Sequence, residues 1–261
     1  MNDRMREVHV VKRDGGGTEP VSDRVAVEEP LEIRLRDTAL AVVMRTPGDD
    51  EDLVTGFFLT EAILIEPAEI SAVELIEEGR IAVTLRDGVD VDPTRFQRNL
   101  FASSSCGVCG KASIEAVEIF AKPVEGHPVG RTLVAGLTDR LRTQQPTFDA
   151  TGGLHAAGLY DLDGNALAVR EDVGRHNAVD KAIGAAAKQR WPLPPSLLVV
   201  SGRQSFEIVQ KAAVVGIGGV VGVSAPSSLA VELAESLGML LIGFSREGAF
   251  NVYAGADRLV D

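Results

Sequence analysis

The segment SLLVVSGRQSFEIVQKAAVVGIGGVVGVSAPSSLAVELAESLGMLLIGFS, at positions 196–245, decides the fold class of this chain. Short apolar runs alternate in it with segments of helical spacing. The pattern predicts strands at 196–202, 219–225 and 239–245 and helices at 204–216 and 227–238. Continuous apolar strands of this kind are typical of a mixed or largely parallel sheet that helices cover on both faces.

Three polar loops follow the three predicted strands. The loops are SGRQS (201–205), SAPSS (224–228) and GFSREG (243–248). If the strands are parallel neighbours, their carboxyl ends share one edge, where open α/β sheets bind ligands. The first two loops also lead into predicted helices, whose amino-terminal N–H groups favour phosphate.

The side chains of these loops suit an anionic ligand. Ser224 and Ser227 are small and carry hydroxyl groups, and Arg203 and Arg246 can add positive charge. Each loop alone is also explained by helix capping and by solvated surface arginines. Three such loops on one edge favour a nucleotide-like ligand, although the G-x-G-x-x-G fingerprint of dinucleotide sites is absent.

The rest of the chain divides into four predicted parts. Residues 1–20 form a loose arm with a glycine-rich break, and 21–100 form a β-rich subdomain with one helix near 46–64. Residues 101–122 contain a cysteine loop and a helix, and 123–261 form an α/β cofactor-binding domain. The overall expectation is an α/β protein (α+β overall) with a mixed sheet.

Composition limits the classes of partner and compartment. The 261 residues carry a net charge of -12, which disfavours binding to nucleic acid or to an anionic membrane. The start of the chain lacks the apolar region of a secretory signal, and glycines and a proline interrupt the longest uncharged run, 212–231. Two cysteines in such a chain predict a cytoplasmic protein without a structural disulfide.

Both cysteines lie in SSSCGVCGK, at 103–111. A structural zinc site needs four ligands, and no histidine stands at finger spacing to complete it, so no zinc is expected. The spacing of Cys106 and Cys109 allows a redox dithiol, although the motif does not follow a strand near the start of the chain. A nucleophilic cysteine that carries sulfur fits the segment better, because small polar residues surround the thiols and a helix after Lys111 favours the thiolate.

Seven stretches together resemble the formate dehydrogenase accessory sulfurtransferase family. They are RTPGDDEDLVTGFFLTEAIL, SSSCGVCGKAS, TGGLHAAGL, REDVGRHNAVDK, SGRQSFEIVQKAA, SAPSSLAVELA and GFSREGAFNVY. They extend over nearly the whole chain after the arm. Leu154 and Ser227 differ from the valine and threonine expected in that family.

The resemblance implies a fold similar to that of cytidine deaminases, without their zinc signature, and a homodimer. It implies a sulfurtransferase that takes persulfide sulfur from a cysteine desulfurase on Cys106, with Cys109 assisting. The sulfur would go to the molybdenum (or tungsten) bis-guanine-dinucleotide pterin cofactor, Mo-bis(molybdopterin guanine dinucleotide), of the formate dehydrogenase catalytic subunit. The residues that would contact the guanine dinucleotide are Phe244, Ser245, Arg246, Glu247, Gly248 and Ala249.

Two questions stay open at this point. Asp172, Arg175 and His176, in REDVGRHN, can form the wall of an active site or a buried network that joins a strand to a helix. His155 is equally a structural residue or a ligand. The function also has two alternatives, a cofactor-binding chaperone without sulfur transfer and a dithiol oxidoreductase.

Overall fold

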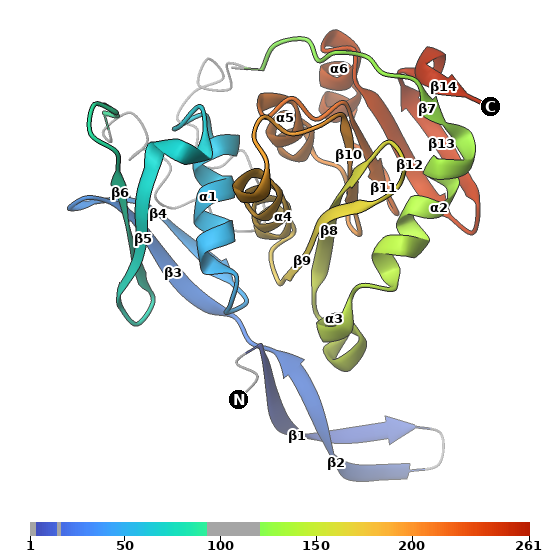
Figure 1. Ribbon diagram of the computed structural model, residues 1–261. Helices are drawn as coiled ribbons and strands as arrows, with labels where there is room; N and C mark the ends of the chain where they lie inside the picture. The colour runs from blue at the N-terminus through green and yellow to red at the C-terminus, as the bar shows by residue number, and fades with distance from the viewer. Residues whose placement is uncertain (1–3, 15–16, 93–120) are drawn as a thin grey trace.

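The computed structural model describes residues 4–14, 17–92 and 121–261 (Figure 1). The elements are β1 (Met5–Asp14), β2 (Gly17–Ala26), β3 (Glu29–Leu35), β4 (Thr38–Arg45), α1 (Asp50–Thr60), β5 (Ile70–Glu77), β6 (Arg80–Leu85), β7 (Val129–Gly130), α2 (Arg131–Arg142), α3 (Pro146–Thr151), β8 (His155–Asp161), β9 (Ala166–Asp172), α4 (Arg175–Gln189), β10 (Ser196–Val200), α5 (Phe206–Val214), β11 (Gly219–Gly222), α6 (Ser228–Ser236), β12 (Leu240–Arg246), β13 (Ala249–Ala254) and β14 (Leu259–Val260).

A six-stranded mixed sheet forms the larger half of the molecule. Its strand order is β13-β12-β11-β10-β8-β9. The central strands β10, β11 and β12 are parallel neighbours, as the alternating pattern of 196–245 predicts. The flanking strands pair antiparallel with their neighbours. Short connections link β8 to β9 and β12 to β13, as antiparallel neighbours allow.

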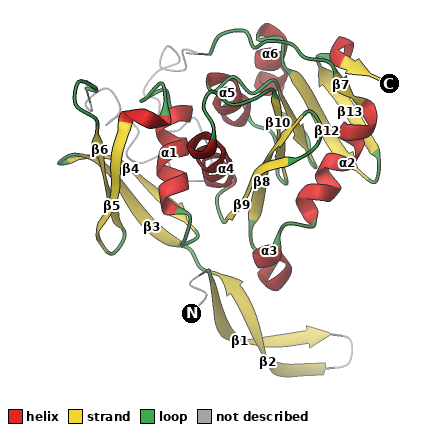
Figure 2. Cartoon of the chain, viewed as in Figure 1, coloured by secondary structure: helices red, strands yellow, loops and turns green. Residues whose placement is uncertain are grey.

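Helices cover both faces of this sheet (Figure 2). Successive side chains of a strand point to opposite faces, and β10 shows the result. Leu198 and Val200 pack with α4, α5 and α6 in one buried cluster. Leu197 and Val199 pack with α2 in another cluster on the opposite face. The expected mixed α/β fold with two covered faces is therefore confirmed.

The smaller half is a four-stranded sheet of order β4-β3-β6-β5, with α1 against it (Figure 1). Leu31, Ile33 and Leu35 of β3 are almost fully buried and pack with Leu53 and Phe58 of α1. Every second side chain of β3 is buried, so the strand presents one face to the core and the other toward solvent. Helix α1 thus lies between this sheet and the larger half.

Two glycines bring α1 and α4 into close contact. A Cβ atom at Gly56 would lie 1.8 Å from the Asp180 carbonyl oxygen, and one at Gly184 would lie 2.0 Å from the Asp52 carbonyl oxygen. Neither position can accept a side chain unless the helices separate. The glycines therefore set the distance between the two halves.

The amino-terminal segment corrects one expectation. Strands β1 and β2 pair antiparallel, from Met5–Ala26 to Asp14–Gly17, in place of a loose arm. Backbone pairing over ten residues of each strand orders the segment, although most of its side chains are exposed. The predicted boundary after residue 20 consequently falls inside β2. Among the described helices, none has the length and apolar character needed to cross a bilayer.

Candidate functional site

Hydrogen bonds join the three predicted loops at the carboxyl edge of β10, β11 and β12. The Gln204 backbone N–H donates to the Ala225 carbonyl at 3.2 Å, and the Ser227 N–H donates to the Gln204 carbonyl at 2.9 Å. The Phe244 N–H donates to the Ser224 carbonyl at 3.1 Å. The structure thus brings the three loops together at one edge, as the parallel strands predict, while ligand binding at this edge stays a prediction.

Gln204 is a central residue of this edge that the sequence analysis missed. Its side chain is fully buried, and Nε2 donates to the Ile242 carbonyl at 3.0 Å and to the Ser224 carbonyl at 3.4 Å. A Cβ at Gly222 would lie 1.6 Å from Nε2, so only glycine leaves room for this amide. A glutamine between a strand and a helix gives no sequence signal for such a role.

Basic side chains gather beside the first loop. Arg175 and His176 begin α4, His155 begins β8, and Arg203 is exposed in the loop itself. A Cβ at Gly202 would lie 3.3 Å from His155 Nδ1 and 4.0 Å from Arg175 Cβ, which shows how closely the loop approaches both residues. Within the described residues, the buried Nε of Arg175 has no hydrogen-bond partner.

The environment of both histidines favours their neutral form. Burial lowers the pKa of His155, and the positive charges of Arg175 and Arg203 lower it further, while Asp172 opposes them. Burial and then the charges of Lys211, Arg175 and His155 lower the pKa of His176 to about 3. His176 Nε2 lies 3.3 Å from both Ser205 Oγ and Glu207 Oε2, at the start of α5.

The residues of REDVGRHN (170–177) divide between a buried network and the loop edge. Asp172 is fully buried, forms an ion pair with Lys181 at 2.8 Å, and accepts hydrogen bonds from the N–H groups of Thr46 and Gly174. Asn177 donates to the same carboxylate at 3.0 Å. Asp172 and Asn177 therefore belong to a structural network that joins β4, β9 and α4. Arg175 and His176 instead lie at the loop edge.

A second buried ion pair lies on the other side of α4. Lys211 of α5 contacts Asp180 of α4 at 3.0 Å, Glu61 at 2.8 Å and Thr60 Oγ1 at 3.0 Å. Burial lowers the pKa of Lys211, but the nearby carboxylates outweigh it, so the pKa is raised overall. This pair ties α1, α4 and α5 together, and its Lys211 charge also acts on His176.

The predicted site residues of the second and third loops differ in burial and in the groups that they contact. Ser227 caps α6, because its Oγ accepts the Ala230 N–H at 3.3 Å. Ser245 is fully buried, and its Oγ lies 3.4 Å from Thr138 Oγ1 on α2. Phe244 is 39% exposed and has a positive φ of 52°. A strained backbone at an exposed aromatic residue is common where a ligand is held.

The remaining predicted site residues lie in the turn after β12 and in the cysteine segment. Arg246, Glu247, Gly248 and Ala249 form the exposed turn between β12 and β13, where Arg246 pairs with Ala249. Cys106 and Cys109 lie outside the described residues. In the described ranges, no group of three or more His, Cys, Asp and Glu side chains is placed to hold a metal ion.

The fold and the basic loop edge define a mixed α/β protein with polar loops gathered at the carboxyl ends of its parallel strands. The model of the FdhD/NarQ family matches residues 26–260, and the chain belongs to this family.

Several known proteins are similar to this chain. A sulfur carrier protein FdhD of Streptomyces coelicolor is 47% identical over 262 residues, which cover 95% of this chain and 92% of the relative. The sulfur carrier protein FdhD of Mycobacterium tuberculosis is 46% identical over 270 residues, which cover 97% of this chain and 97% of the relative. A crystal structure described as that of a formate dehydrogenase accessory protein from Desulfotalea psychrophila has a TM-score of 0.80 and 25% identity, and covers 98% of this chain and 100% of its own.

Proposed function

We propose that this chain is a sulfurtransferase for formate dehydrogenase. Cys106 accepts persulfide sulfur from a cysteine desulfurase and passes it to a molybdenum (or tungsten) bis-guanine-dinucleotide pterin, which binds at the carboxyl edge of β10, β11 and β12. Relatives described as sulfur carrier proteins align with this chain over almost their whole length, and they support the sulfur-carrying part of the proposal.

The basic edge is the observation that carries the binding part. The protein has a net charge of -12, yet the guanidinium groups of Arg175 and Arg203 gather beside the start of α5, next to two histidines whose lowered pKa keeps them neutral. The exposed N–H groups of a helix start add partial positive charge. Phosphate groups are the anions that such an arrangement favours.

The third loop suits a flat ring system. Phe244 presents an exposed aromatic ring next to the SAPSS loop, to which its backbone N–H is bonded. Aromatic faces stack on nucleobases with free energies of about 1–3 kcal/mol per base. A guanine base stacked on Phe244 would place its phosphates toward the basic edge.

The chemistry requires two balanced steps. In the first, the Cys106 thiolate attacks the outer sulfur of the desulfurase persulfide, and the desulfurase leaves as a thiolate. In the second, the Cys109 thiolate attacks Sγ of Cys106, which releases the carried sulfur as hydrosulfide to the metal centre of the bound substrate. A Cys106–Cys109 disulfide results, and a cellular thiol reduces it before the next cycle.

Mass spectrometry tests the first step. The full chain is incubated with a cysteine desulfurase and cysteine, and one added sulfur atom is expected on Cys106. Cys106→Ala should abolish it, while Cys109→Ala should retain it because only the release step is lost. A Cys106→Ala protein that still supports active formate dehydrogenase would show the assignment to be wrong.

Titration with GDP tests the binding half. A chaperone without sulfur transfer would bind GDP but carry no persulfide and would tolerate loss of either cysteine. A dithiol oxidoreductase would need both cysteines equally and would bind no nucleotide. GDP binding together with unequal effects of the two cysteine variants is expected only for the proposed carrier.

A further inference from the structure

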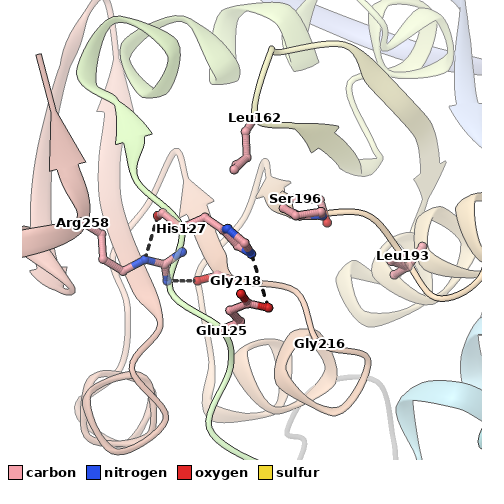
Figure 3. Close-up of a pocket in the computed structure, with 9 residues that line it drawn as sticks. Glu125, His127, Leu162, Leu193, Ser196, Gly216, Gly218 and Arg258 are labelled. Atoms are coloured by element: carbon pink, nitrogen blue, oxygen red, sulfur yellow. Dashed lines mark hydrogen bonds and ion pairs between the residues drawn. The ribbon is translucent and has the colours of Figure 1, made fainter.

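A cavity of about 140 Å³ lies at the amino ends of β10 and β11, the opposite edge of the sheet from the candidate site (Figure 3). Ser196 begins β10 and Gly218 precedes β11, while His127 and Arg258 come from segments next to β7 and β14. A water molecule occupies about 30 Å³ of liquid. The volume therefore fits a ligand of about four to six heavy atoms.

Arg258 supplies a positive charge to the cavity wall. Arg258 is only 9% exposed. Its guanidinium donates hydrogen bonds only to backbone carbonyls, those of His127, Gly218 and Gly238. Within the described residues, no carboxylate lies within ion-pair distance of its guanidinium, and Nη2 makes no hydrogen bond. Burial lowers the pKa of Arg258, and the negative charge of Asp257 opposes this shift only in part.

Ser196 contributes an independent signal on the facing wall. It is 2% exposed, and its Oγ has no hydrogen-bond partner in the part of the chain that the structure describes. A buried hydroxyl without a partner costs about 1–3 kcal/mol. A guest that accepts a hydrogen bond would satisfy this hydroxyl and the guanidinium Nη2 together.

The remaining wall limits the kind of anion. Leu162, Leu193 and Pro195 make one side of the cavity apolar. Glu125 stands at the mouth, 86% exposed and 3.8 Å from His127 Nε2, so a doubly charged anion would be repelled there. These features favour a single negative charge attached to a short apolar tail.

We infer that this cavity binds a small aliphatic carboxylate. The carboxylate accepts hydrogen bonds from Arg258 Nη2 and Ser196 Oγ, and its tail of one to three carbon atoms packs against Leu162 and Leu193. The inference does not depend on the proposed sulfur transfer, because none of these residues belongs to the loop edge.

Titration of the full chain with butyrate, followed by ¹⁵N–¹H NMR, tests the inference. Saturable shifts are expected for the amides of 125–127, 196 and 216–218. Inorganic phosphate and sulfate serve as comparison anions and should bind more weakly because of Glu125. Absence of saturable shifts with butyrate, or tighter binding of phosphate than of butyrate, would overturn the inference.

Ser196→Ala is the decisive variant because it should not harm folding. The native hydroxyl has no partner in the described structure, so its removal should leave the melting temperature unchanged or higher. The affinity for butyrate should fall about tenfold, because a hydrogen bond to a charged group is lost. The matched control is Ser236→Ala on α6, whose hydroxyl bonds the Leu233 carbonyl outside the cavity and should not affect affinity. Equal affinities of wild type and Ser196→Ala would refute the assignment.

Discussion

The Lys181 ammonium lies 2.8 Å from the Asp172 carboxylate, and both side chains are withdrawn from solvent, with exposures of 1% and 0%. Lys181 also donates to the Thr46 carbonyl at 2.7 Å, and Asp172 accepts the Thr46 N–H at 3.0 Å. The pair therefore fastens the segment before α1 to the start of α4. Its position makes it a structural link between the two halves of the molecule.

Removal of one partner of this pair should destabilise the protein strongly. Asp172→Asn leaves the Lys181 charge buried without its counter-ion, and such changes cost about 3–5 kcal/mol. Urea denaturation followed by circular dichroism measures the loss. The control is Lys188→Met, which removes a cation that is 32% exposed beside Asp52 and should cost under about 1 kcal/mol. Equal losses in the two variants would contradict a special role for the buried pair.

The helix contact at Gly184 yields a second prediction. Gly184→Ala places a Cβ 2.0 Å from the Asp52 carbonyl oxygen, so α1 and α4 must separate. We expect a loss of about 3 kcal/mol or more in the free energy of unfolding. Gly136→Ala on α2 is the matched control, because nothing lies within 4 Å of its added Cβ. That variant should gain about 0.5–1 kcal/mol from helix propensity, and the opposite signs are the result to check by thermal or urea unfolding.

The histidine at the loop edge predicts a pH dependence of stability. The pKa of His176 is lowered to about 3 in the folded protein, from an ordinary value of 6.5. The unfolded chain therefore binds more protons below pH 6.5, and stability falls as the pH falls. Between pH 6.5 and pH 5, His176 contributes a loss of up to about 2 kcal/mol.

His176→Gln should make this pH dependence smaller. Urea midpoints measured at pH 7.5 and pH 5 should differ less in this variant than in the wild type. His9→Gln, on the exposed strand β1, is the control and should keep the wild-type difference. An unchanged difference in His176→Gln would contradict the burial of a neutral histidine at this position.

The sequence predicted the central fold well because its signal is local. Apolar runs and helical spacing over 196–245 suffice to place three parallel strands and two helices, and all five elements are present. The antiparallel attachment of β8 to β10 depends instead on long-range pairing that periodicity does not encode. The β1–β2 hairpin was missed because glycines and charges conceal a ladder with little burial.

The site was predictable only in part. The three loops could be placed at one edge because parallel strands share their direction, and the structure confirms this meeting. The hydrogen bonds of Asp172 and Lys181 to Thr46 and of Lys211 to Thr60 could not be predicted, since these partners lie on other segments far along the chain. The same holds for Gln204, whose burial depends on the space left by Gly222.

Two residues of the loop edge should separate binding from stability. Arg203→Gln removes an exposed cation from the basic edge and should weaken GDP binding several-fold, with a smaller loss at high salt because screening already reduces the attraction.

Ser227→Ala removes the cap of α6 and should lower the free energy of unfolding by about 1 kcal/mol, while GDP affinity stays within twofold. Calorimetric titration and urea unfolding of the same two variants measure both effects. Loss of GDP affinity in Ser227→Ala at full folding would show that this hydroxyl contacts the ligand, and unchanged affinity in Arg203→Gln would remove Arg203 from the proposed edge.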